Sequence, residues 1–339
     1  MPVRLKDIAE ELGVSTVTVS KVLRGSSDVG DVMRARVLQR MKELNYQPNM
    51  LARALTSGQS LAVGLVVPDL VHPFFAELAK SLGGTLRQSG FALMLASSEE
   101  DPEIEHAEIR TMLHRGMDAI IVASCQPHAT TRPLLDNTGT PLVLLDRRFR
   151  SLKANFVGCN DVMAGELATR HLLAIGRTRI AHIGGSSTSP SIDRLHGYQR
   201  ALRKAGVSLP KNYVVTRERF EEAGDIAGYQ AMQELLSRRV RPDAVFCYND
   251  LTAVGAMQAA MDAGVSIPQE MAFVGCGNLR YAPYLKVPLT SIDQETTRMG
   301  AMVGELAISL ARTPRQPLQV KLLEPTLVVR QSSVAGSAD

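Results

Sequence analysis

The chain has 339 residues, of which 45% are hydrophobic and 21% charged, and its formal net charge at pH 7 is +4. The sequence has no apolar signal segment and no apolar run long enough to span a bilayer, which argues against a secreted or membrane-spanning protein and leads us to expect a cytoplasmic one. The cysteines at 125, 159, 247 and 276 lack metal-ligand spacing and the seven histidines are dispersed, so we expect reduced thiols and no bound metal.

The first 44 residues predict three helices, at 5–12, at 16–23 and at about 31–44, because their apolar residues recur at helical spacing. Gly13 permits a sharp turn between the first two helices, and Ser15 stands at the N-cap position of the second. This order is typical of a helix-turn-helix, whose second helix enters a major groove. The first 60 residues carry nine Lys and Arg against six Asp and Glu, a bias that a solvated surface also explains, so the helix pattern carries the prediction.

Beyond residue 60, short β-branched runs alternate with helical segments. The runs lie at 61–67, 91–96, 119–123, 142–146, 180–184, 244–248 and 272–276. Such alternation predicts parallel sheets with helices on both faces. About 280 residues exceed one ordinary hydrophobic core, so we expect two α/β lobes.

Two short motifs raise the alternative of an enzyme. The glycines and serines at 184–187 follow a strand but lack the lysine of a phosphate-binding loop and the spacing of a dinucleotide fingerprint. Residues 208–211 match the pattern S-x-x-K, yet their proline makes a poor helix start and no companion motif follows. We therefore predict no catalytic residues and no cofactor.

Ten motifs in register carry a resemblance to a known family. They read LKDIA at 5–9, GVS at 13–15, TVSKVL at 18–23, LNYQPN at 44–49, HPFF at 72–75, DAII at 118–121, LDR at 145–147, RLHGY at 194–198, YND at 248–250 and PLTSIDQ at 288–294. Together they resemble the LacI/GalR (lactose-repressor) family of bacterial transcription regulators over most of the chain.

The resemblance implies an all-α helix-turn-helix headpiece at 1–47, a hinge helix and linker at 48–60, and a two-lobed α/β core of the periplasmic-binding-protein type at 61–339. The first lobe would comprise about 61–159 and 294–322, and the second about 162–290 and 325–331. Strand crossings near 158–161, 291–294 and 322–325 would join the lobes, with a ligand between them.

The resemblance also implies how double-stranded DNA is contacted. The family's base-reading positions correspond to Thr16, Val17 and Lys21, and its phosphate contacts to Thr18, Ser20, Arg24 and Arg34. Lys21 can donate to guanine O6 or N7, and Val17 offers only apolar contact with a thymine methyl. Two residues depart from the family pattern: Asp28 and Gly30 stand where a neutral polar residue and a serine or threonine are common. Since Asp28 would repel a phosphate, we do not expect phosphate contact there.

A hinge helix is implied at 49–56, where alanines and leucines suffice for a short helix that is marginal alone. In the family two such helices pair over the minor groove, and Asn49, Ala52 and Leu55 match their contact positions. A leucine matching Leu55 enters a central base step and kinks the duplex. Residues 330–339 lack the leucine heptads of a tetramerising tail, so we expect a homodimer on a near-palindromic operator.

The implied effector site lies at the carboxyl ends of the strands, where open parallel sheets place ligand-binding groups. Its residues would be Phe74, Phe75, Asp146, Arg194, Phe220, Asn249, Gly277 and Gln294. We place Arg194 just before the helix that contains residues 197 and 198, as a bidentate donor to a polyhydroxylated ligand. Many relatives have an aspartate at the Gly277 position; its loss, with two arginines directly after Asp146, permits an acidic sugar.

The prediction is therefore a DNA-binding repressor of a carbohydrate-utilisation operon, controlled by a small sugar or sugar acid and associated with the bacterial nucleoid when bound. A solute-binding protein without a DNA role and a purine- or nucleoside-responsive regulator are the alternatives. The sequence does not determine the identity of the effector, the direction of its action or the operator.

Overall fold

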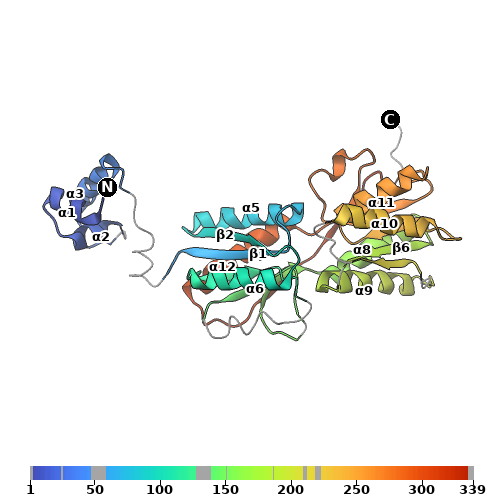
Figure 1. Cartoon of the computed structure of the whole chain (residues 1–339), viewed down its shortest axis with the longest axis horizontal. Helices are drawn as coiled ribbons and strands as arrows, with labels where there is room; N and C mark the ends of the chain where they lie inside the picture. Colours follow the sequence, from blue (N-terminus) through green and yellow to red (C-terminus); the bar gives the residue numbers. More distant parts are fainter. Residues whose placement is uncertain are drawn as a thin grey trace. The chain divides into compact units, whose positions relative to one another are not determined.

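The structure is a computed structural model, and it describes residues 3–23, 26–46, 59–126, 139–149, 151–185, 187–208, 212–217 and 223–334. The chain divides into two compact units, 1–60 and 61–339. Figure 1 shows the smaller, helical unit in blue and the larger unit as two lobes of sheets covered by helices.

The smaller unit consists of α1 (Leu5–Leu12), α2 (Thr16–Leu23) and α3 (Asp31–Glu43). These helices enclose a core of apolar side chains: Ile8, Ala9, Val19, Val22, Val29, Val37 and Met41. Gly13 ends α1 in the left-handed region at φ 65°, and the Ser15 hydroxyl accepts the Thr18 backbone N–H at 3.1 Å. The predicted turn and N-cap are thus confirmed, while α3 ends one residue earlier than predicted.

The first lobe of the larger unit is a six-stranded parallel sheet in the order β11-β5-β4-β3-β1-β2. Its strands are β1 (Ala62–Val67), β2 (Ala92–Ser97), β3 (Ala119–Val122), β4 (Leu142–Leu145), β5 (Asn155–Cys159) and β11 (Val320–Leu323). One face packs against α5 (Pro73–Gln88) and α12 (Thr296–Arg312), and the other against α6 (Pro102–His114).

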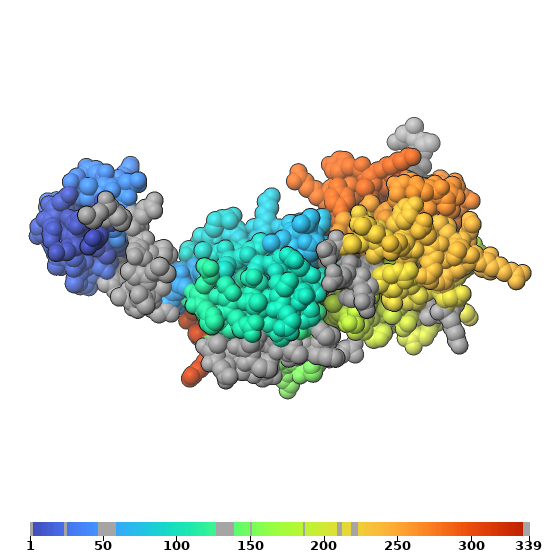
Figure 2. Space-filling model, viewed as in Figure 1, coloured from blue at the N-terminus to red at the C-terminus, as the bar shows by residue number. Residues whose placement is uncertain are grey.

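The second lobe is a six-stranded sheet in the order β12-β10-β9-β8-β6-β7. Its strands are β6 (Ile180–Gly184), β7 (Val214–Thr216), β8 (Ala244–Cys247), β9 (Ala272–Cys276), β10 (Thr290–Asp293) and β12 (Thr326–Val328). Helices α8 (Asp161–Ala174) and α9 (Ser189–Lys204) pack on one face, and α10 (Gly224–Leu236) and α11 (Asp250–Asp262) on the other. A 3-10 turn, η1 (Ala282–Tyr284), precedes β10. The two lobes lie side by side in the space-filling view, the first cyan to green and the second yellow to orange (Figure 2).

The predicted fold class is confirmed, and each predicted strand is present with its end moved by at most one residue. The prediction of parallel sheets needs one correction, because β12 pairs antiparallel with β10 at the edge of the second sheet.

The chain passes between the lobes three times: from β5 to α8, from β10 to α12 and from β11 to β12. The helices within the described ranges include none that is long and apolar enough to cross a membrane.

Candidate functional site

Helix α2 presents one face to the core of the smaller unit and the other to solvent. Val19 and Val22 are buried, whereas Thr16 and Val17 are exposed, and 58% of Val17 is accessible. Lys21 lies partly exposed near the end of the same helix. The three residues predicted to read bases are therefore available at the surface, and an exposed valine gains by covering an apolar group such as a thymine methyl.

Three polar residues of the predicted DNA surface make contacts within the smaller unit. Lys21 Nζ lies 3.1 Å from an Asp28 carboxylate oxygen, and the hydrogen bond from Lys21 lowers the pKa of Asp28. The Thr18 hydroxyl is 3.0 Å from the Ser15 hydroxyl. Arg34, predicted to contact phosphate, donates to the Ser26 carbonyl at 2.6 Å and to a second carbonyl of the same loop. Thr18 and Arg34 thus have local structural roles that the sequence did not reveal.

Several predicted site residues lie outside the described part of the chain. These are Arg24 of the DNA surface, the hinge residues Asn49, Ala52 and Leu55, and Phe220 of the effector site. Their predicted roles stay predictions.

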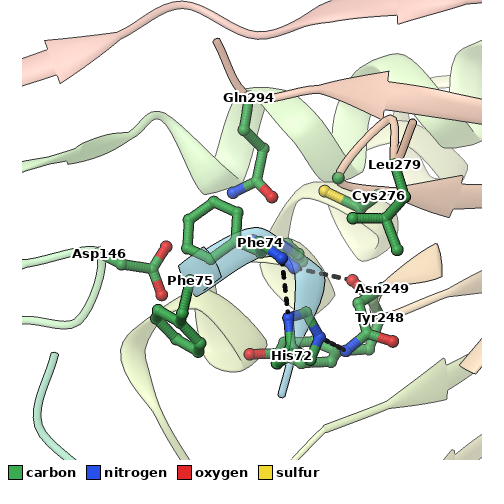
Figure 3. Close-up of a pocket in the computed structure, with 11 residues that line it drawn as sticks. His72, Phe74, Phe75, Asp146, Tyr248, Asn249, Cys276, Leu279 and Gln294 are labelled. Carbon is green, nitrogen blue, oxygen red and sulfur yellow. Dashed lines mark hydrogen bonds between the residues drawn. The ribbon is translucent and has the colours of Figure 1, made fainter. Parts of the chain in front are cut away.

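A pocket between the lobes of the larger unit gathers the other predicted effector residues. It is lined by His72, Phe74, Phe75, Asp146, Arg194, Tyr248, Asn249, Cys276, Gly277, Leu279 and Gln294. These residues come from the start of α5, from α9 and from the carboxyl ends of four strands, and Figure 3 shows how their side chains converge. The pocket holds about 20 Å³ of free space, roughly the room that one water molecule requires.

His72 joins the two lobes at this pocket. Its Nδ1 accepts the Phe74 backbone N–H at 3.2 Å and so caps α5, and its Nε2 is 3.3 Å from the Asn249 amide nitrogen (Figure 3). The Asn249 amide oxygen accepts the N–H and the hydroxyl of Thr252, each at 2.8 Å, as the N-cap of α11. Asn249 therefore presents its amide nitrogen to His72. Sequence reasoning missed His72, although the motif at 72–75 contained it.

Arg194 lies within α9, not before it as the sequence suggested, and only 3% of its surface is accessible. Its Nε–H donates to Asp161 at 2.8 Å and its Nη1–H to the Tyr248 carbonyl at 2.7 Å. Glycines make this possible: a Cβ at Gly197 or Gly165 would collide with the backbone of the other helix. Helices α8 and α9 consequently approach closely enough to bury the ion pair. Burial raises the pKa of Asp161, and Arg194 opposes that shift.

Asp146 and Gln294 supply polar groups to the pocket that Phe74 and Phe75 also line. Asp146 follows β4 in the left-handed region at φ 59° and is buried, a conformation that aspartate tolerates better than most residues. The buried Gln294 Nε2 has no hydrogen-bond partner among the described residues. An amide donor of this kind ordinarily finds an acceptor, here one that a ligand in the pocket can provide. Arg147, also buried, places its guanidinium 6.0 Å from the Phe75 ring centre.

Gly277 occupies a position that would strain an aspartate. Its φ is 131°, which favours glycine. A Cβ at this position would lie 3.8 Å from an oxygen of Asp250, which is buried and accepts the Ser291 hydroxyl at 2.5 Å and the Leu279 N–H at 2.8 Å. Burial raises the pKa of Asp250 to about 6. A second carboxylate at position 277 would repel that of Asp250, so glycine in place of the aspartate of many relatives fits its surroundings.

Among the residues that the structure describes, no group of three or more His, Cys, Asp and Glu side chains is arranged to hold a metal ion. Burial raises the pKa of the Cys125 and Cys276 thiols to about 12, and it also raises those of Cys159 and Cys247. The thiols therefore remain protonated at neutral pH and are weak nucleophiles.

Comparison with known proteins agrees with both units. A family model described as "Bacterial regulatory proteins, lacI family" matches residues 4–49, and one described as "Periplasmic binding protein-like domain" matches residues 169–333. The ribose operon repressor of Escherichia coli (strain K12) is 33% identical over 331 residues, which cover 97% of this chain and 99% of the relative. The HTH-type transcriptional repressor PurR of Klebsiella pneumoniae (strain 342) is 32% identical over 337 residues, covering 98% and 97%.

Solved structures show the same architecture. The lac repressor dimer bound to operator and the anti-inducer ONPF superposes with a TM-score of 0.87 at 25% identity, over 99% of this chain and 100% of that one. The cellobiose complex of the transcriptional regulator CelR gives 0.74 at 28% identity, over 98% and 100%. Because relatives more than 30% identical align over nearly the whole length, the chain belongs to the lacI family of bacterial regulatory proteins, which are DNA-binding transcription regulators and not enzymes.

Proposed function

We propose that this regulator represses a carbohydrate-utilisation operon and is controlled by a small sugar or sugar acid bound between the lobes of its core. It binds a near-palindromic operator as a homodimer, placing α2 of each protomer in a major groove and the hinge segments in the minor groove. It acts in the cytoplasm and is associated with the nucleoid when bound. The relatives named as ribose operon repressors support a sugar effector.

The chemistry of the pocket is the observation that carries the proposal. Asp146 offers carboxylate oxygens, Gln294 offers a buried amide donor with no hydrogen-bond partner among the described residues, and Phe74 and Phe75 pack edge to face at 5.0 Å between ring centres. A sugar has hydroxyls that donate and accept and a ring face of C–H groups that packs on aromatic rings. Convergent polar groups on an apolar wall suit such a ligand.

The size of the pocket implies that ligand binding changes the arrangement of the two lobes. About 20 Å³ of free space does not hold a sugar, so the side chains at the lobe boundary must move when a ligand enters. The contact between His72 and Asn249 spans that boundary. A ligand that prefers one lobe arrangement by about 1–3 kcal/mol is sufficient to change operator affinity about 5- to 150-fold.

A thermal-shift screen tests the effector class, using pentoses, hexoses, sugar acids, disaccharides and purines. A site occupied at 100 times its Kd stabilises the protein by roughly 2.7 kcal/mol. We expect a sugar or a sugar acid to raise the Tm of the wild type but not of Asp146→Asn. Glu305→Gln, an exposed change on α12 of the same lobe, serves as the control and should respond normally. A shift caused only by purines would support the nucleobase alternative instead.

A further inference from the structure

The surface predicted to read DNA carries an ion pair between α2 and the loop that follows it. Lys21 Nζ and Asp28 Oδ2 are 3.1 Å apart, and the two side chains are 41% and 63% accessible. Both groups are therefore at the surface while paired. A carboxylate is an unexpected neighbour for a lysine that meets DNA, because the duplex carries one negative charge per about 1.7 Å of its axis.

The loop that carries Asp28 is held from both sides. The Arg34 guanidinium donates to the Ser26 carbonyl at 2.6 Å and to the Val29 carbonyl at 3.3 Å, and the Val29 side chain is buried in the core of the smaller unit. The backbone on each side of Asp28 is thereby fixed. The carboxylate consequently stays near Lys21 without an entropy cost for ordering the loop.

The two kinds of DNA acceptor respond differently to such a pair. A phosphate attracts the net charge of a cation, and a carboxylate beside the cation cancels most of that attraction. A guanine edge is uncharged and requires only a correctly placed N–H donor. A lysine ammonium has three donors, so one bond to Asp28 leaves two for a base.

We propose that Asp28 is a specificity-determining residue, which cancels the attraction of Lys21 for phosphates and orients its ammonium group toward base edges. The inference rests on the DNA-binding role of the family and on Lys21 as a base-reading residue. In this arrangement Asp28 reduces binding to DNA of any sequence and preserves binding to the operator, so that it raises the ratio between the two affinities.

The test compares Asp28→Asn with Glu10→Gln in the full-length chain. Glu10→Gln removes the same charge and breaks another exposed ion pair, Lys6–Glu10, in the same unit. Binding to a random-sequence duplex is measured by fluorescence anisotropy at several salt concentrations, beside a duplex selected by the wild type from a randomised pool. For Asp28→Asn we expect tighter binding to the random duplex, a plot of log K against log[salt] that is steeper by about 0.9, and a smaller affinity ratio between the two duplexes. Glu10→Gln should leave that ratio unchanged.

A second pair of variants establishes whether Asp28 acts through Lys21. In the Lys21→Gln background, Asp28→Asn should no longer steepen the salt dependence. The same steepening with and without Lys21 would overturn the proposal, since Asp28 would then repel phosphates on its own account. Identical behaviour of Asp28→Asn and Glu10→Gln would overturn it as well. If the wild type bound neither duplex, the DNA-binding role itself would be wrong, which is a separate result.

Discussion

Replacing Arg194 with methionine removes one half of a buried ion pair. Asp161, 6% accessible, would lose its partner at 2.8 Å, and the Tyr248 carbonyl would lose a donor at 2.7 Å. Breaking a buried pair in this way costs about 3–5 kcal/mol, because the remaining charge is uncompensated. Since whole domains have stabilities of about 5–15 kcal/mol, Arg194→Met should be severely destabilised.

The double variant Arg194→Met with Asp161→Asn removes the stranded charge and should recover most of the lost stability. Exchanging a buried pair for neutral groups is often neutral or favourable, which leaves a cost of about 1–3 kcal/mol for the hydrogen bond from Arg194 that the Tyr248 carbonyl loses. The single variant should also regain stability as the pH falls. Without Arg194 the folded pKa of Asp161 lies still further above its unfolded value of 3.8, so that the folded state binds the proton more readily.

Urea unfolding followed by far-ultraviolet circular dichroism measures these stabilities, because the chain has no tryptophan to report by fluorescence. Operator binding with and without effector is then measured on the stable double variant. We expect normal operator binding and no effector response, since the guanidinium donors are gone. A double variant as unstable as Arg194→Met would refute the account based on the stranded Asp161 charge. A stable double variant that responds like the wild type would show that Arg194 does not bind the effector.

Three further predictions concern the stability of the core and the coupling between effector binding and operator binding. Burial lowers the pKa of His182 from 6.5 to about 4. The folded state therefore favours the neutral imidazole, and its contribution to the free energy of unfolding is complete above pH 6.5. About 3 kcal/mol of that free energy is lost as the pH falls to 4. His182→Phe should remove that loss when urea unfolding is measured as a function of pH. The same loss of stability between pH 6.5 and 4 in the variant would contradict this. Gly277→Asp should lower stability by about 1–3 kcal/mol through its positive φ, and unfolding curves equal to the wild type would exclude strain there. Leu55→Ala should weaken operator binding and reduce the bending of the operator DNA in gel-shift assays, while the effector affinity of the DNA-free protein is unchanged. Equal effector affinity of the wild type with and without operator would disprove the coupling between effector binding and operator binding.

The strands predicted from the sequence differ physically from those that were missed. The predicted ones are largely apolar runs, and most of them are central parallel strands that are buried on both faces; β2, at the edge of the first sheet, is the exception. Strand β10 reads Thr-Ser-Ile-Asp, and its first two side chains are buried although they are polar, because partners far along the chain satisfy them. The Thr290 hydroxyl is 2.7 Å from that of Ser333, and the Ser291 hydroxyl donates to Asp250. No local pattern reveals hydrogen bonds between residues some 40 positions apart.

The candidate site was partly predictable for a related reason. Seven of the eight predicted effector residues line one pocket, because they stand at strand ends or helix starts where the topology brings segments together. The prediction that Arg194 mainly serves a ligand omitted Asp161, which lies 33 positions earlier and meets it only through the close approach of α8 and α9. His72 lay within a recognised motif, but its contact with Asn249 depends on the packing of the two lobes.

The positions of these residues explain how a ligand can change the angle between the lobes. Asp161 is the first residue of α8, directly after the first crossing, and Gln294 lies in the second crossing between β10 and α12. The first and third crossings are bonded to each other, since the Asn160 N–H donates to the Leu323 carbonyl at 2.9 Å and its side-chain amide to Glu324 at 3.3 Å. A ligand that accepts hydrogen bonds from Arg194 and Gln294 therefore acts at the connections between the lobes. Packed elements move as rigid bodies about such connections, so small shifts in the pocket become rotations of the lobes.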